Sequence, residues 1–144
     1  MTVRTPSHAA LLGPEALPCY DRGGGASTTP LVTRALGTAG FITGHTSFGA
    51  GAEIPFHSHN CKESVVLMKG RATLDIDGLE YELKPHDATY IPPGISPRLR
   101  NLSKTEPMKI IWIYAGADAT RTADIGGRIG TKAFGQAVVA ALRA

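Results

Sequence analysis

Short runs of alternating apolar and polar residues, separated by glycine and proline, fill the middle of the chain. In residues 71–76, apolar side chains stand at every second position, which is the period of a half-buried β-strand. Asp77 and Gly78 follow, and this dipeptide favours a type I′ hairpin turn because both of its central residues need positive φ. Residues 79–83 supply the returning strand, so the sequence predicts a hairpin here.

The same pattern predicts more strands along the chain. They span residues 31–36, 41–48, 54–59, 64–68, 88–91, 96–102 and 108–114. Many short strands at even spacing, with turn signals between them, are typical of an all-β sandwich or barrel. A length of 144 residues predicts a single domain, large enough to bury a core without disulfide bonds.

The two ends of the chain differ from this middle part. Residues 1–30 are rich in glycine, proline, serine and threonine, and we expect an irregular N-terminal arm. Residues 31–115 form the expected barrel, and residues 116–144 a C-terminal loop and short helix. Thr131 is the expected cap of that helix, and Phe134 and Leu142 belong to its apolar face.

Composition excludes some classes of protein. The formal net charge is +3, but the basic residues are scattered, so we expect no nucleic acid as a partner. The first apolar stretch is cut short at Gly13 and Pro14, so we expect no signal peptide and no membrane span. Two cysteines, Cys19 and Cys61, indicate a reducing compartment, and the expected location is the cytoplasm.

The candidate chemistry lies between residues 51 and 70. His57 and His59 are one residue apart, so in a strand they point to the same face. Glu63 has the same parity and can join them if the chain bends. Two imidazoles and a carboxylate suit one divalent transition metal, either iron, manganese, nickel or zinc, and they leave coordination positions open.

Glycines frame this candidate metal site. Gly51 stands six positions before His57, and Gly70 stands seven positions after Glu63. The spacing G-x5-H-x-H-x3-E-x6-G resembles the first motif of the cupin superfamily without a departure. The resemblance implies a double-stranded β-helix, the jelly-roll barrel of small single-domain cupins, with His57, His59 and Glu63 as metal ligands.

The second cupin motif, G-x5-P-x-G-x2-H-x3-N, is only partly present. Pro92, Gly94 and Asn101 match it, whereas His86 stands at the first glycine position and Pro97 at the histidine position. Because that histidine is the fourth metal ligand in the family, this chain lacks a protein ligand at residue 97.

Three interpretations of this departure stay open. A three-ligand site can persist with an additional open position. Another side chain can fill the gap, and the candidates are His45, which has the parity to point inward if its strand is regular, and Cys61, which lies beside the ligands. Alternatively, the metal is lost, and the two histidines and Glu63 bind a ligand directly.

Strand parity also sorts residues outside the motif. If Pro97 faces inward, Arg98 and Arg100 face outward. Thr73, Asp75 and Tyr90 are candidate lining residues of the barrel. Other residues are expected to have structural roles. Trp112 and Tyr114 share one face of the final strand and are expected in the core, and His86 is expected at the surface.

The resemblance to cupins limits the choice of function without fixing it, because cupins include oxygenases, isomerases, lyases and non-catalytic binding modules. The leading hypothesis is a metal-dependent enzyme, oxygenase-like or an isomerase or lyase, that acts on a small polar organic molecule. The alternative is a non-catalytic small-molecule-binding or sensory cupin. We expect a homodimer, because exposed strand edges and a flexible arm favour pairing.

Overall fold

The computed structural model describes residues 9–36, 40–54 and 60–116. The elements in these ranges are η1 (Pro14–Ala16), β1 (Tyr20–Gly23), β2 (Ala26–Pro30), η2 (Arg34–Leu36), β3 (Phe41–Phe48), β4 (Glu53–Ile54), β5 (Lys62–Lys69), β6 (Ala72–Ile76), β7 (Leu79–Leu83), β8 (Arg98–Asn101) and β9 (Met108–Ala115). Both helices are single turns of 3-10 helix, and no helix of the described ranges could cross a membrane.

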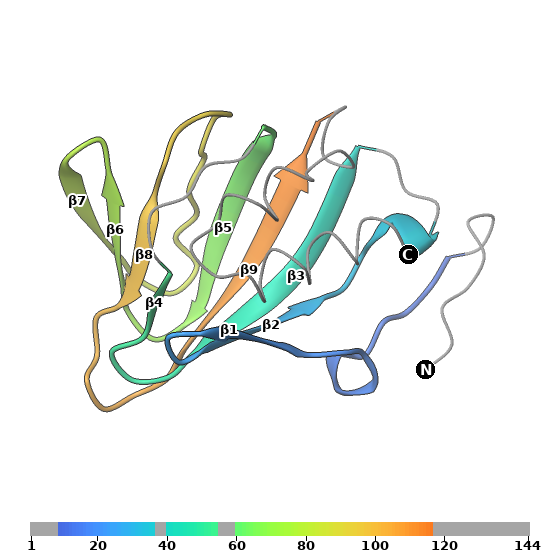
Figure 1. Cartoon of the computed structure of the whole chain (residues 1–144), viewed down its shortest axis with the longest axis horizontal. Coiled ribbons are helices and arrows are strands. Elements are labelled where there is room, and N and C mark those ends of the chain that lie inside the picture. Colours follow the sequence, from blue (N-terminus) through green and yellow to red (C-terminus); the bar gives the residue numbers. More distant parts are fainter. Residues whose placement is uncertain (1–8, 37–39, 55–59, 117–144) are drawn as a thin grey trace.

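The strands form two antiparallel sheets (Figure 1). One sheet has the order β1-β2-β3-β9-β5 and the other the order β4-β8-β6-β7. From β3 to β6, consecutive strands alternate between the sheets, and β9 returns to lie between β3 and β5. The prediction of an all-β jelly-roll barrel is therefore confirmed.

Alternation along each strand builds the core between the two sheets. In β3 and β9 every second residue is buried, and the largest fully buried side chains include Ile42, Phe48, Leu67, Met108 and Tyr114. Burying apolar side chains from both sheets against one another is the main stabilising contribution to such a fold.

The predicted hairpin is confirmed. Asp77 and Gly78 both have positive φ, 50° and 80°, and β6 pairs with β7 from Ile76 opposite Leu79 onward. Gly70 has a φ of 93°, and a Cβ at this position would lie 2.9 Å from the carbonyl oxygen of Pro107. The turn after β5 therefore accepts glycine and excludes larger residues.

The N-terminal region differs from the expected irregular arm. Residues 20–30 contain β1 and β2, and β2 pairs with β3 along its whole length. Glycines 23–25 all have positive φ and make the turn between the two strands. The prediction of an irregular arm is therefore wrong for residues 20–30, where the glycines make the turn of a hairpin.

Three other predictions of structure need comment. The strand predicted for residues 31–36 is wrong: after Val32 the chain turns, and Leu36 donates a backbone hydrogen bond to Thr33. Residues 88–91 make isolated bridges to β5 at Ala88 and Ile91, short of a full strand. The predicted C-terminal helix lies outside the described residues.

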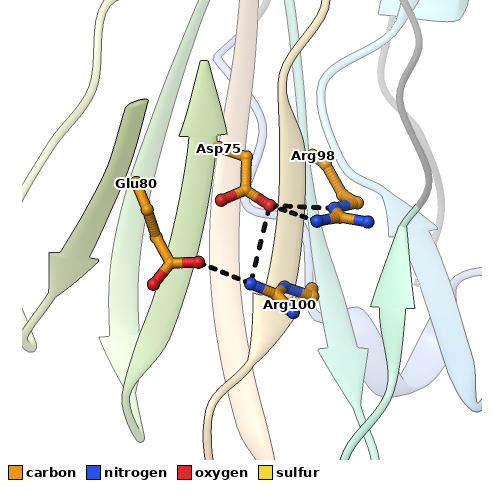
Figure 2. Close-up of polar contacts among 4 residues, drawn as sticks. All are labelled: Asp75, Glu80, Arg98 and Arg100. Atoms are coloured by element: carbon orange, nitrogen blue, oxygen red, sulfur yellow. Dashed lines mark hydrogen bonds and ion pairs between the residues drawn. The ribbon is translucent and has the colours of Figure 1, made fainter. Parts of the chain in front are cut away.

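The outer face of the four-stranded sheet carries a cluster of ion pairs (Figure 2). The side chain of Arg98 donates two hydrogen bonds, of 2.9 and 2.7 Å, to Oδ2 of Asp75, and Arg100 donates one of 2.8 Å to Glu80. These hydrogen bonds and charges hold the pKa of Asp75 below its usual value. Both arginines face outward, as parity predicted, whereas Asp75 belongs to this outer cluster and does not line the barrel interior.

Candidate functional site

A cavity of about 30 Å³ lies inside the barrel, between the two sheets. A space of this size holds one or two water molecules. Among the residues that the structure describes, its walls are mostly apolar and include Arg22, Thr46, Glu63 and Thr89 as polar residues. Two of these four have ionisable side chains of opposite type, the basic Arg22 and the acidic Glu63, which makes the cavity the candidate site.

Glu63 reaches the cavity from the second residue of β5. Its backbone exchanges two hydrogen bonds with Ile91, of 3.0 and 2.8 Å, and its register partner in β9 is Tyr114. Strand alternation turns the side chain inward, where it is 6% exposed. Burial raises the pKa of Glu63 to about 8, and the positive charge of Arg22 opposes that rise.

The other two predicted ligands, His57 and His59, lie outside the described residues. The structure describes the chain on both sides of them, and Ile54, at the end of β4, lines the same cavity as Glu63. Among the residues that the structure describes, no group of three His, Cys, Asp or Glu side chains could hold a metal. The three-ligand set therefore stays a prediction.

Pro97 lines the cavity together with Glu63. The residue at the position of the missing fourth ligand thus faces inward, which is the condition under which parity predicts that Arg98 and Arg100 face outward. A proline ring has no donor atom for a metal, so this wall of the cavity offers only an apolar surface.

His45 does not take over as a ligand. In β3 the buried residues are Ile42, Gly44, Thr46 and Phe48, and Thr46 rather than His45 lines the cavity. Burial and the charge of Lys109 lower the pKa of His45 on the outer face of the sheet. The parity prediction for His45 is wrong because the alternation changes phase between β4 and β5: the buried residues have even numbers from Ile42 to Ile54 and odd numbers from Cys61 to Leu67.

The other candidate residues do not line the cavity. Cys61 is buried, Cys19 is exposed, and neither forms a disulfide. His86 is exposed, as expected, and adopts a φ of 78°. Thr73 and Tyr90 are absent from the cavity wall.

Arg22 is the functional candidate that the sequence analysis missed. It is the buried residue of β1, 3% exposed, and its side chain lines the cavity. Burial lowers the pKa of its guanidinium to about 10, so the group stays positively charged at neutral pH. The signal for it was available: strand residues on both sides of the three glycines predict a hairpin that would carry an arginine at an inward position.

An aromatic pair forms the wall of the cavity that belongs to β9. The rings of Trp112 and Tyr114 are stacked with centroids 4.9 Å apart, and both side chains are buried. The indole N–H of Trp112 lies 3.2 and 3.0 Å from the hydroxyls of Thr28 and Thr46. Burial, followed by the negative charge of Glu63, raises the pKa of Tyr114, so its hydroxyl stays protonated.

The Trp112 ring lies flat against β3 because the opposing residue is Gly44. A Cβ at this position would be 2.1 Å from the ring carbon Cζ2, so any other residue would collide with the ring. The cavity wall therefore depends on a glycine and a tryptophan that face each other in neighbouring strands.

Comparison with known proteins identifies the barrel. The family model described as "Cupin domain" matches residues 44–114, from β3 to the end of β9. A comparison with curated proteins finds no match.

Solved structures of cupins share the fold. An RmlC-like cupin from Shewanella frigidimarina is 21% identical with a TM-score of 0.61, over 70% of this chain and 85% of that one. The polyketide cyclase RemF from Streptomyces resistomycificus is 15% identical with a TM-score of 0.65, over 75% and 80% of the two chains. KdgF from a Halomonas species is 16% identical with a TM-score of 0.63, over 77% and 97%. With the family match, the first motif and the jelly-roll topology in agreement, the chain belongs to the cupin superfamily.

Proposed function

We propose that this protein is a metal-binding cupin in which His57, His59 and Glu63 hold one divalent transition metal at the mouth of the barrel. The observation that carries the proposal is the position of Glu63, whose carboxyl group is buried in the cavity wall. Burial disfavours the carboxylate form of Glu63, and a divalent ion shared with two imidazoles from the same segment would stabilise that form.

The donor set suits such an ion. One carboxylate and two imidazoles are the ligands of non-haem iron sites and of catalytic zinc sites. The apolar side chain of Pro97 adds no fourth protein ligand, so coordination positions would stay open to a small molecule. The bound metal would supply Lewis acidity or redox chemistry to that molecule.

The residues of the chain would do the rest of the work. The apolar walls, which include Ile91, Leu99 and Ile110, exclude bulk water and strengthen electrostatic interactions within the cavity. The stacked Trp112 and Tyr114 rings form a rigid part of the cavity wall. We propose an enzymatic role on this basis, with oxygenase-like, isomerase or lyase chemistry on a small polar molecule. RemF, a structural neighbour, is named as a polyketide cyclase.

A second candidate function is a non-catalytic, small-molecule-binding cupin. Two observations favour it: the cavity has room for only one or two waters, and Pro97 replaces the fourth ligand. In this case the ligands would hold a small molecule with or without a metal, and no turnover would follow.

Elemental analysis of tag-free protein, purified without a nickel column or chelator, tests the metal site. We expect close to one equivalent of iron, manganese, nickel or zinc per chain. The variants His57→Ala, His59→Ala and Glu63→Ala should each lose the metal while keeping the far-ultraviolet circular dichroism of the parent. The exposed His86→Ala variant is the matched control and should keep it.

Stoichiometric metal in a folded Glu63→Ala protein would contradict the assignment. If the parent protein takes up no metal after incubation with each of the four ions, the binding-module function replaces the metal site as the proposal.

A further inference from the structure

Arg22 places a buried positive charge in the cavity wall, and the three proposed metal ligands do not explain its presence. It comes from β1, which precedes the part of the chain that matches the family model. Its side chain is nevertheless as buried as those of the core, at 3% exposed, and lies in the wall of the same cavity as Glu63. A buried guanidinium is rare unless a negative charge compensates it.

In the described cavity wall the only carboxylate is Glu63, and Arg22 and Glu63 interact electrostatically. With a divalent cation on Glu63, the sum of the charges of the metal, the carboxylate and the guanidinium becomes about +2 in a cavity with apolar walls. The loaded site would therefore attract an anion.

We propose that Arg22 binds the carboxylate group of a small anionic ligand inside the barrel, next to the metal. This inference rests on the proposed function and names the class of molecule that the site takes. The planar guanidinium of arginine matches a carboxylate through two parallel hydrogen bonds.

The walls of the cavity favour a carboxylate over a phosphate group. A phosphate carries more charge and three exposed oxygens, which need several donors, whereas Arg22 is the only cationic residue that lines this cavity in the described part of the chain. The volume of about 30 Å³ is that of one or two waters, and a carboxylate head group can replace these. The remaining walls, among them Ile54 and Leu74, would contact the carbon atoms of the ligand.

Two binding measurements on the same proteins test the inference. Electron paramagnetic resonance of free Mn²⁺ gives the affinity for the metal. Saturation-transfer NMR with acetate, and with acetamide as its neutral analogue, gives the affinity for the anion in the presence and absence of Mn²⁺. The variants are Arg22→Gln and Arg22→Lys, and the exposed Arg34→Gln is the control with the same change in net charge.

We expect Arg22→Gln to change the two affinities in opposite directions. Acetate binding should weaken about 10- to 100-fold, because a charge-assisted bidentate pair is lost. Mn²⁺ binding should stay equal or become tighter, by up to about 10-fold, because a neighbouring positive charge is removed. Arg22→Lys keeps the charge without the planar fork and should fall between the parent and Arg22→Gln. Arg34→Gln should match the parent in both measurements.

Equal acetate affinities in folded parent, Arg22→Gln and Arg22→Lys proteins would overturn the inference, as would acetamide binding as tightly as acetate. Phosphate that binds more tightly than acetate in an Arg22-dependent manner would overturn the choice of a carboxylate. A parent protein that binds none of the four ions but binds acetate through Arg22 would refute the proposed metal site and support the anion site. The failure of one proposal is thus separated from the failure of the other.

Discussion

Replacing Glu63 with glutamine should change how the stability of the metal-free protein depends on pH. The pKa of this carboxyl group is raised from 4.5 in the unfolded chain to about 8 in the folded protein. The folded state therefore holds the proton more tightly, so its contribution to stability is complete below the unfolded pKa. It is lost as the pH rises through the folded pKa.

The size of the effect follows from the shift. Each pKa unit corresponds to about 1.4 kcal/mol, so the full loss is about 5 kcal/mol, and about 3.5 kcal/mol of it falls between pH 5 and pH 8. Glutamine has a similar shape and no charge at any pH. The free energy of unfolding of Glu63→Gln should therefore lack this decrease, whereas contributions from the histidines are common to both proteins and cancel in the difference.

Urea unfolding followed by circular dichroism, at several pH values and with a chelator present, measures this difference. Glu53→Gln is a matched control, because Glu53 is an exposed carboxylate on β4 and its removal should leave the pH profile of the parent unchanged. If the parent and Glu63→Gln proteins follow parallel curves from pH 5 to pH 8, burial does not raise the pKa of Glu63 and the reasoning is refuted.

Three more substitutions have defined outcomes. Pro97→His should tighten Mn²⁺ binding by at least about 10-fold, because residue 97 lines the cavity, whereas the exposed Pro93→His should leave Mn²⁺ binding unchanged. If a folded Pro97→His protein binds Mn²⁺ no more tightly than the parent, its imidazole does not reach the metal. His86→Gly should raise the free energy of unfolding by about 1 kcal/mol, since His86 has a φ of 78°; a lower value in urea unfolding would contradict the expected strain. Gly44→Ala should lower the free energy of unfolding by about 1 to 3 kcal/mol or more, because the added Cβ collides with Trp112, whereas Gly49→Ala, whose Cβ would make ordinary contacts, should lower it less. Equal decreases in the two variants would refute the packing argument.

Sequence reasoning predicted the barrel because its signals are local. The hairpin turn at residues 77–78 follows from residue types that accept positive φ, and the period of two identifies the inner face of β6 and β9. Parity likewise placed Arg98 and Arg100 on the face opposite to Pro97. These inferences succeed because each depends on one strand or one turn.

The errors arose where the chain has to be followed across a turn. The prediction for His45 assumed one continuous alternation up to the motif, whereas the buried residues have even numbers as far as Ile54 and odd numbers from Cys61 onward. Arg22 was overlooked because the glycine-rich stretch beside it was interpreted as part of an irregular arm, whereas β1 and β2 pair as a hairpin and β2 pairs in turn with β3. β1 has four residues and lies at the edge of the five-stranded sheet, so its own sequence carries a weak strand signal.

Trp112 is the only tryptophan of the chain, and it stands in the wall of the cavity. Intrinsic fluorescence excited at the indole band therefore comes from one place, a ring stacked on Tyr114 and fixed by two threonine hydroxyls. A paramagnetic ion or a ligand that enters the barrel would quench or shift this emission, and the protein carries its own optical reporter for the occupancy of the site. No label has to be attached to follow binding as it happens.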